Sequence, residues 1–138
     1  LFRSIFDGTL LENISLGRNI DQHYINQIID QLQLKSHVQQ LPLGIHQPID
    51  PMGKKLPRSV VQKIILARSI VNQPRLLMLE NTLDAIESEE RKKIISYLCG
   101  KDQPWTMIII SEDPLVHQQC DEVVNMKKNG MSLNQKSN

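Results

Sequence analysis

RLLMLENTLDAIESEE, residues 75–90, runs from an apolar segment directly into a group of carboxylates with one amide among them. Residues 76–79 are all apolar, which is typical of a short strand that a parallel sheet buries on both faces. Glu80 and Asn81 follow at the end of this predicted strand. A helix is predicted to begin at a Ser88 cap, because the next two residues are glutamates, which suit the positive end of a helix dipole.

Segments on both sides of this stretch continue an alternation of strands and helices. Residues 107–110 and 122–126 are predicted strands, the second closed by a turn at residues 128–130. Upstream, a helix that is apolar on almost all sides is predicted to begin at a Ser59 cap and to end before Pro74. This order predicts an open α/β sheet, in which ligands bind beyond the carboxyl ends of the strands. The polar residues expected at those ends are Glu80, Asn81, Ser111 and Glu112.

The N-terminal half is predicted to be mainly helical. Thr9 and Glu12 have the spacing of a capping box, which predicts a short helix over residues 10–16. Residues 21–34 carry apolar side chains at helical spacing and predict an amphipathic helix. Residues 36–57 contain four prolines and two glycines and are therefore predicted to form turns and short extended pieces.

The composition is that of an ordinary globular protein. With 138 residues, the chain suits one domain with one core. Its net charge of +1 gives no field that would attract nucleic acid, so no nucleic-acid partner is expected. Cys99 and Cys120 lie far apart and are expected to be free thiols in a reducing compartment. Neither a membrane span nor a signal peptide is evident, and because the chain begins with Leu1 we expect a fragment of a longer protein.

Five blocks of the sequence, taken in order, resemble the C-terminal two-thirds of the nucleotide-binding domain of ABC transporters, particularly of the exporter type. LFRSIFDGTLLENISLG resembles the segment after that family's Q-loop, and LPLGIHQPID the segment ahead of the signature motif. KKLPRSVVQKIILARSIVNQPRLLMLENTLDAIESEE has the layout of the signature, Walker B and D-loop without a gap. TMIIISEDPLVHQQCDEVVNMKKNGM resembles the switch segment and the strand after it.

The resemblance implies an α/β fold of the P-loop NTPase (RecA-like) type, present as a fragment. The whole chain, residues 1–138, would be one partial ABC nucleotide-binding domain. Residues 10–72 would form the helical subdomain with the signature helix. Residues 73–133 would form the C-terminal part of the RecA-like core, with part of the parallel sheet and its flanking helices, and residues 134–138 a tail.

In the signature loop, most of the residues that the family uses are replaced. Only Leu56 is kept, and the expected Ser, Gly, Gly and Gln are replaced in turn by Pro57, Arg58, Ser59 and Val60. The resemblance places this loop against the terminal phosphate of ATP bound across a dimer. The bulk of two of these side chains and the missing N–H of the proline are expected to prevent that contact. Lys55 or Arg58 could still meet an anion in another way.

The implied catalytic positions are altered as well. Glu80 stands at the Asp that is linked to magnesium, and as a hard oxygen donor it could still hold Mg²⁺. Asn81 stands at the glutamate that acts as catalytic base, and its amide cannot take a proton from water. Glu112 stands at the switch histidine, where a carboxylate would repel a phosphate. Glu87 replaces the Asp of the D-loop, which is a milder change.

The resemblance therefore implies a degenerate ATP-binding domain that couples nucleotide binding to transmembrane transport, with hydrolysis at its own site impaired or lost. Its implied partners are the transmembrane domains of the transporter and a second nucleotide-binding domain, in a homo- or heterodimer at the cytoplasmic side of the cell membrane. The full-length protein could bind ATP and Mg²⁺. Neither is expected to bind tightly to this fragment, because the P-loop GxxxxGK, followed by Ser or Thr, does not occur in these residues.

Other interpretations remain open at the level of sequence. The alternative function is a non-catalytic docking or dimerisation module that keeps the ABC fold without using nucleotide. Without the resemblance, the acidic residues would most simply be a solvated loop and helix start, and the basic turn at residues 54–58 a solvated one. Ser111, Glu112 and His117 lack the surroundings of a nucleophile elbow. Residues 34–49 are a candidate surface for docking to the membrane-spanning domains. The histidines lack the spacing of metal ligands: His23, His37, His46 and His117.

Overall fold

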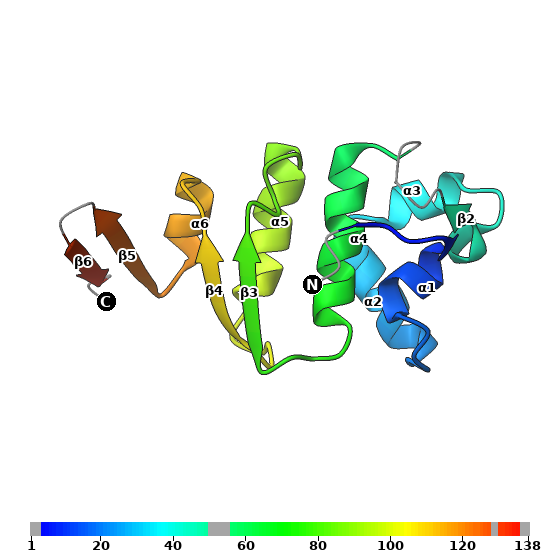
Figure 1. The fold of residues 1–138 in the computed structure, drawn as a ribbon, viewed down its shortest axis with the longest axis horizontal. Coiled ribbons are helices and arrows are strands. Elements are labelled where there is room, and N and C mark those ends of the chain that lie inside the picture. Colours follow the sequence, from blue (N-terminus) through cyan, green and yellow to red (C-terminus); the bar gives the residue numbers. More distant parts are fainter. Residues whose placement is uncertain (1–3, 50–55, 128–129, 136–138) are drawn as a thin grey trace.

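A computed structural model describes residues 4–49, 56–127 and 130–135 of the chain (Figure 1). Lys55 and most of the turn predicted at residues 128–130 therefore lie outside the described residues. The helices are α1 (Leu10–Ser15), α2 (Gln22–Gln31), α3 (Lys35–Gln40), the 3-10 turn η1 (Gly44–His46), α4 (Arg58–Ile70), α5 (Ser88–Leu98) and α6 (Pro114–Gln119). The strands are β1 (Gly8–Thr9), β2 (Pro48–Ile49), β3 (Leu76–Glu80), β4 (Thr106–Ile110), β5 (Glu122–Lys127) and β6 (Gly130–Gln135).

The predicted N-terminal helices are present, together with one that was not predicted. The capping box of α1 is confirmed, since the Glu12 N–H donates to Thr9 Oγ1 at 3.1 Å and the Thr9 N–H donates to Glu12 Oε2 at 2.7 Å. α2 begins after an Asp21 cap. The prediction of mainly turns and short extended pieces for residues 36–57 is wrong at its start, where α3 forms. The first proline of that region is Pro42, so the residues before it have backbone N–H groups free to make a helical turn.

Two predicted helix caps are displaced by one or two residues. α4 is capped by Pro57 rather than by Ser59, because the Pro57 carbonyl accepts hydrogen bonds from the N–H groups of Val60 and Val61. α5 is capped by Glu87 rather than by Ser88. The two predicted caps are the second and the first residues of their helices.

The predicted parallel pair is confirmed, while the third strand belongs to a separate sheet. β3 and β4 run parallel, with Leu76 opposite Thr106 and Glu80 opposite Ile110. β5 pairs antiparallel with β6, and these two strands form a sheet of their own. Strand β6 occupies residues that were predicted as the end of the core and a tail. Its polar sequence carries little strand propensity, so the hairpin was not visible beyond its turn.

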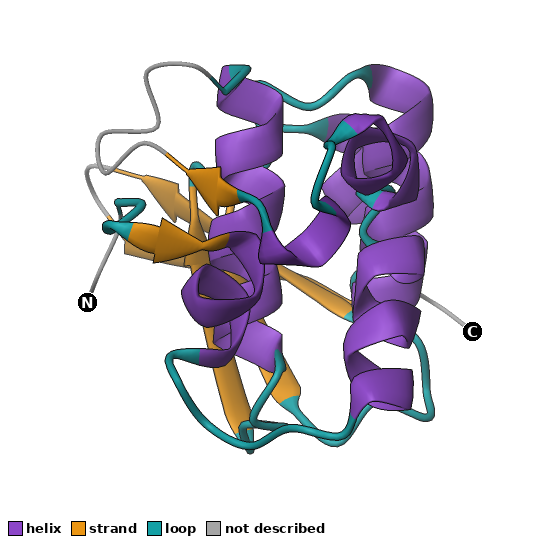
Figure 2. Cartoon of the chain, turned by 90° about the vertical axis from the view of Figure 1, so that its right-hand side faces the viewer, coloured by secondary structure: helices purple, strands orange, loops and turns teal. Residues whose placement is uncertain are grey.

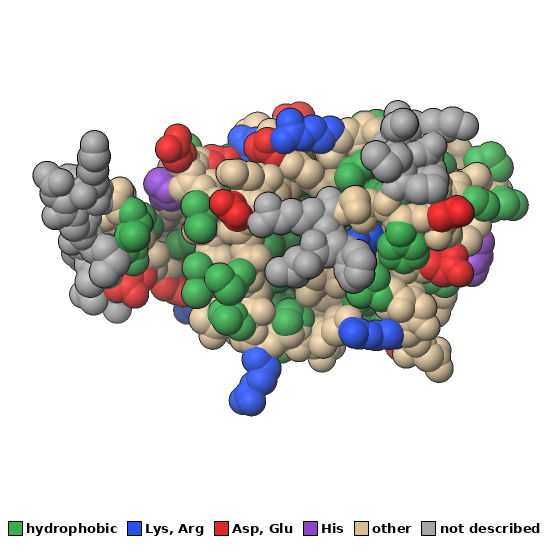
Figure 3. Space-filling model, in the orientation of Figure 1, with side chains coloured by type: hydrophobic (Ala, Val, Ile, Leu, Met, Phe, Trp, Pro, Cys, Tyr) green, Lys and Arg blue, Asp and Glu red, His purple; other side chains and the backbone are tan. Residues whose placement is uncertain are grey.

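The prediction that both faces of the parallel strands are buried is wrong. Leu77 and Leu79 are 3% and 4% exposed, but Met78 and Ile110 are 69% and 63% exposed. Figures 1 and 2 show the helices on one side of β3 and β4, so one face of this sheet packs into the core and the other is open. Apolar side chains gather over these strands on the open face (Figure 3). We call this surface the open sheet face: Leu76, Met78, Ile108 and Ile110.

Two buried cations of α4 connect parts of the chain that are far apart in sequence. The Arg68 side chain donates to the carbonyl oxygens of Asn13 and Ser4 at 2.7 and 2.9 Å, which fixes the N-terminal segment against α4. Lys63 donates to Glu90 Oε2 at 2.7 Å and to the Gln33 carbonyl at 3.1 Å. Since Glu90 lies on α5, this second contact joins the helical half of the chain to the strand-bearing half.

Candidate functional site

The carboxyl ends of β3 and β4 form one edge that brings the predicted catalytic positions together. Glu80 is the last residue of β3 and lies opposite Ile110, the last residue of β4. Asn81 and Glu112 follow these two strands, and the side chains of all three polar residues are exposed. The parallel register thus explains why residues thirty positions apart share one edge of the sheet.

Asn81 adopts a backbone conformation that suits its side chain. Its φ is 50°, in the left-handed region that asparagine tolerates better than most other residues. Its carbonyl oxygen accepts a hydrogen bond from Gln62 Nε2 at 3.3 Å. Asn81, at the position predicted for the catalytic base, therefore also forms the turn by which the chain leaves β3.

The segment predicted as the signature loop, residues 56–60, leads into α4, and its side chains differ in burial. Leu56 and Ser59 are half-buried, and Pro57 is exposed. Val60 is buried in the hydrophobic core, 7% exposed, so its side chain cannot reach a ligand outside the helix. Arg58 is exposed and is the one cation within these five residues.

The anion that Arg58 meets is a carboxylate of its own chain. Arg58 Nη2 lies 2.7 Å from Asp84 Oδ2, between side chains that are 73% and 47% exposed. Gln62 Nε2 donates to the other oxygen of the same carboxylate, and Gln62 Oε1 accepts from the Ala85 N–H at 3.0 Å. The hydrogen bond from Gln62, and to a smaller extent the charge of Arg58, lowers the pKa of Asp84.

The contacts of Gln62 and Asp84 were not predicted from the sequence. The sequence offers one signal for a role of Gln62 beside Arg58, because Gln62 lies four residues after Arg58 and therefore on the same face of a helix. Asp84 lies 22 positions from Gln62 and 26 from Arg58, so both of its contacts follow only from the packed structure.

Glu87, which the sequence predicts at the D-loop position, caps α5. Its carboxylate accepts hydrogen bonds from the N–H groups of Glu89 and Glu90 at 3.1 and 3.4 Å. Arg91, one turn further on, donates to the Ile86 carbonyl at 3.0 Å. The residues just before α5 are thus fixed from the helix side as well as from α4.

The segment after β4, which contains the predicted site residue Glu112, is fixed by its neighbour Asp113. Asp113 Oδ2 lies 2.7 Å from Arg91 Nε, and Oδ1 accepts the Leu115 N–H at 2.9 Å, which caps α6. His117 Nε2 lies 2.9 Å from the carbonyl oxygen of Ser111, not from its hydroxyl. This geometry gives no support to a Ser–His nucleophile at this edge.

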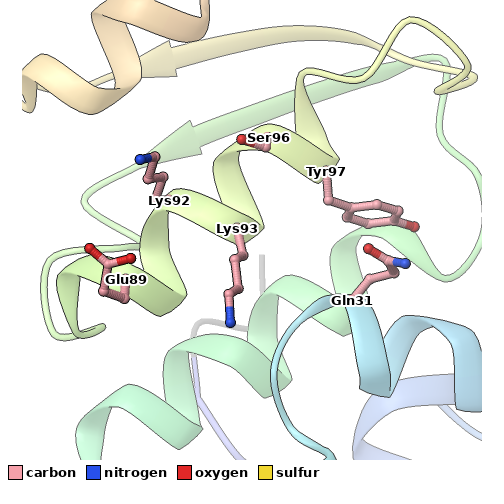
Figure 4. A pocket seen from close by; sticks show the side chains of 6 residues that line it. All are labelled: Gln31, Glu89, Lys92, Lys93, Ser96 and Tyr97. Atoms are coloured by element: carbon pink, nitrogen blue, oxygen red, sulfur yellow. The ribbon is translucent and has the colours of Figure 1, made fainter.

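Little else in the described part of the chain offers a metal or ligand site. Among residues 4–49, 56–127 and 130–135, no group of three His, Cys, Asp or Glu side chains could hold a metal ion. At the end of β3, the exposed Glu80 carboxylate could supply one hard oxygen ligand to Mg²⁺. A shallow hollow of about 530 Å³ lies between α2 and α5, where Figure 4 shows Tyr97 beside Gln31. None of the predicted site residues lines it.

A second hollow and the lengths of the helices bear on contacts with a partner protein or a membrane. A second hollow, of about 350 Å³, lies on the helical half, with Ile29, Val38 and Ile45 among its lining residues. It involves part of residues 34–49, the segment predicted to dock. Within the described ranges, no helix is both long and apolar enough to cross a membrane.

The fold is that of part of an ABC exporter. The solved structure of a bacterial Atm1-family ABC exporter with ATP bound superimposes on 88% of the chain with a TM-score of 0.78, at 20% sequence identity. The chain corresponds to 21% of that exporter chain. No family model matches the sequence.

Related sequences belong to the same class of protein. A Rickettsia bellii protein named as an export ATP-binding/permease protein is 31% identical over 93 residues, which cover 67% of this chain and 16% of the relative. P-glycoprotein 14 of Caenorhabditis elegans is 28% identical over 125 residues, 90% of this chain and 9% of the relative. The chain thus spans at most about a sixth of these two relatives.

Proposed function

We propose that the chain is the C-terminal part of the nucleotide-binding domain of an ABC exporter, and that it couples ATP binding to transmembrane transport within a larger protein. The observation that carries the proposal is the edge formed by β3 and β4. It brings Glu80, Asn81 and Glu112 together, next to a helix that starts at the signature position, in a fold similar to that of an exporter with ATP bound. In this proposal residues 10–72 act as the helical subdomain and residues 73–133 as part of the core.

Hydrolysis at this domain's own site is impaired or lost in the proposal. The Asn81 amide cannot accept a proton, and losing a positioned general base costs a factor on the order of 10² to 10⁴ in rate. Glu112 presents a negative charge where the family presents a histidine to phosphate, and this charge opposes binding of the terminal phosphate. Val60 is packed in the core, which supports the loss of a normal signature contact.

Mg²⁺ and ATP belong to the full-length protein in this proposal. Glu80 would supply one oxygen ligand to Mg²⁺, which usually keeps several waters and binds nucleotide phosphates besides one or two carboxylates. The phosphate-binding residues would come from the rest of the larger protein. The open sheet face supports an origin in a larger fold, because parallel sheets are ordinarily covered on both faces.

The proposed partners are the transmembrane domains and a second nucleotide-binding domain, at the cytoplasmic side of the membrane. The hollow lined by Ile29, Val38 and Ile45 supports docking on the helical half, since Val38 and Ile45 lie within the segment predicted to face the membrane-spanning domains and Ile29 lies beside them in the hollow. The exporter names and the fold of the matched proteins support the same arrangement.

Nucleotide binding by the full-length protein tests the proposal. Mg-ATP at millimolar concentration should raise the melting temperature, because a ligand that binds only the folded state stabilises it. ADP and a magnesium-free sample serve as controls. No shift with any nucleotide would refute nucleotide binding at this site. Combining Asn81→Glu with Glu112→His should not restore full ATPase activity, since the signature loop is also altered.

The alternative is a docking module that keeps the fold without using nucleotide. It is favoured by the intrachain contacts of two altered positions, because Glu87 caps α5 and Arg58 pairs with Asp84. An intact P-loop upstream in the full-length protein would favour the ATP-binding proposal, and a disrupted one the docking module.

A further inference from the structure

The segment that leaves β3 is held to the start of α4 by one cluster of side chains. Arg58 and Gln62 lie one turn apart on α4, and both reach Asp84. Gln62 also donates to the Asn81 carbonyl at 3.3 Å and accepts the Ala85 N–H at 3.0 Å. The Gln62 side chain thus contacts three of the five residues 81–85.

The centre of this cluster is protected from solvent while its rim is not. Gln62 is only 9% exposed, whereas the side chains of Arg58 and Asp84 are 73% and 47% exposed. The buried Gln62 amide fixes the geometry of the contact, because its nitrogen and its oxygen both make hydrogen bonds. The exposed ion pair adds a contribution that salt can screen.

Both members of the ion pair stand where the resembled ABC pattern has small or uncharged residues. Arg58 replaces a glycine of the signature, and the D-loop pattern Ser-Ala-Leu-Asp has a serine where this chain has Asp84. This chain therefore carries opposite charges at two positions that contact each other, and the resembled pattern has neither charge.

We propose that Arg58, Gln62 and Asp84 form an intramolecular latch that holds residues 81–87 against α4 of the same chain. The latch rests on the proposed function for its biological meaning, since it would fix the D-loop to the signature helix within one domain and reduce its freedom to respond to a partner domain. Arg58 and Asp84 then act as positioning residues. In this arrangement Arg58, in the altered signature loop, contacts a carboxylate of its own chain rather than a phosphate.

Hydrogen exchange measured by mass spectrometry on the 138-residue chain tests the latch directly. Asp84→Asn keeps an acceptor for Gln62 but removes the charge, and it should speed exchange in peptides covering residues 81–87 by about two- to fivefold. Gln62→Glu keeps the shape but replaces the donor by a second carboxylate, and it should speed exchange there by about tenfold or more. Peptides from β3 and the second half of α5 should not change.

A charge-pair cycle separates the latch from a general loosening. Arg58→Ala and Asp84→Asn should have effects that do not add in the double variant, because each removes the same ion pair. Asp102→Asn, an exposed carboxylate change in a turn outside the cluster, is the matched control and should leave exchange of residues 81–87 unchanged. Added salt should speed this exchange in the unsubstituted chain and not in the double variant.

Equal exchange of residues 81–87 in the unsubstituted chain, Asp84→Asn and Gln62→Glu would overturn the latch, and so would additive effects in the cycle. Neither outcome bears on nucleotide binding by the full-length protein. Conversely, absence of Mg-ATP binding would refute the proposed function while leaving the exchange result intact, so the two proposals fail separately.

Discussion

Removing the Arg68 guanidinium should destabilise the chain more than any other single polar change in its helical half. Arg68 is 7% exposed, and its side chain donates hydrogen bonds to three acceptor atoms of the described residues. Two reach the Asn13 carbonyl and Oδ1 at 2.7 and 3.0 Å, and one reaches the Ser4 carbonyl at 2.9 Å. The guanidinium also lies 5.2 Å from the centre of the Phe6 ring. Burial lowers the pKa of Arg68, so these contacts offset a real desolvation cost.

The size of the effect follows from what Arg68→Met leaves behind. Each net hydrogen bond to a charged group contributes about 1.5–3 kcal/mol, but the three do not add fully, because methionine recovers apolar packing. The carbonyl oxygens of Asn13 and Ser4 would lose these partners, and only water entry could replace them. We expect the free energy of unfolding to fall by about 3–5 kcal/mol, out of a total on the order of 5–15 kcal/mol. Arg68→Lys should cost about half as much, because an ammonium can still reach one or two of the acceptors.

Urea unfolding followed by tryptophan fluorescence provides the measurement. Trp105 is the only tryptophan, is 8% exposed and donates to the Leu98 carbonyl at 3.0 Å, so its emission reports on the core. Circular dichroism on the same samples tests whether the helical half unfolds in the same transition. Arg18→Met, at an exposed position, is the matched control and should change stability by less than about 0.5 kcal/mol. A loss below about 1 kcal/mol in Arg68→Met would refute the assignment of Arg68 as the main connection between α4 and the N-terminal segment.

Four further results are expected. Glu87→Ala should cost about 0.5–2 kcal/mol through loss of the α5 cap, whereas Glu87→Asp should cost less because a carboxylate remains; equal losses in urea unfolding would contradict the cap. Burial lowers the pKa of His37, whose Nε2 has no hydrogen-bond partner among the residues that the structure describes. The neutral form is thus favoured in the folded state, so stability should be constant above about pH 7 and fall as the pH drops below about 6.5, and a His37→Gln chain that kept the same slope would exclude this histidine as the cause. Met78→Lys with Ile110→Lys should leave the melting temperature nearly unchanged and reduce self-association in analytical ultracentrifugation, because both side chains lie on the open sheet face; unchanged association would show that another surface is responsible. Asn81→Glu should lower stability by about 1 kcal/mol relative to Asn81→Gly, since the backbone is left-handed there, and equal melting temperatures would argue against this strain.

The sequence predicted best the features that depend on local periodicity. Helices α1, α2, α4 and α5 and the parallel pair of strands follow from apolar spacing and caps, and the shared strand ends of Glu80 and Glu112 follow from the parallel order. α3 was missed because prolines later in the segment outweighed a short helical start. The open sheet face was missed because apolar residues on both faces of a strand indicate burial only when a covering layer is present.

Side-chain partners were the least predictable feature. Lys63 and Glu90 are 27 positions apart, and nothing local to either residue indicates their 2.7 Å contact. Glu87 was predicted at the D-loop position. The structure shows that it also caps α5, because its carboxylate accepts hydrogen bonds from the N–H groups of the first helical turn. Such pairings depend on how helices pack on the strands, which a single sequence without related sequences does not fix.

If the proposed function holds, the positions that differ from the ABC pattern are also coupled to the stability of the domain. Replacing Arg58 by the glycine of the resembled ABC pattern would leave Asp84 without this cation, and replacing Asn81 by glutamate would place a larger side chain in a left-handed conformation. Only Glu87 could return to aspartate and still offer a carboxylate to α5. A chain with restored catalytic residues therefore needs compensating changes at their partners, and an inactive revertant becomes informative about catalysis only after its fold and its latch have been measured.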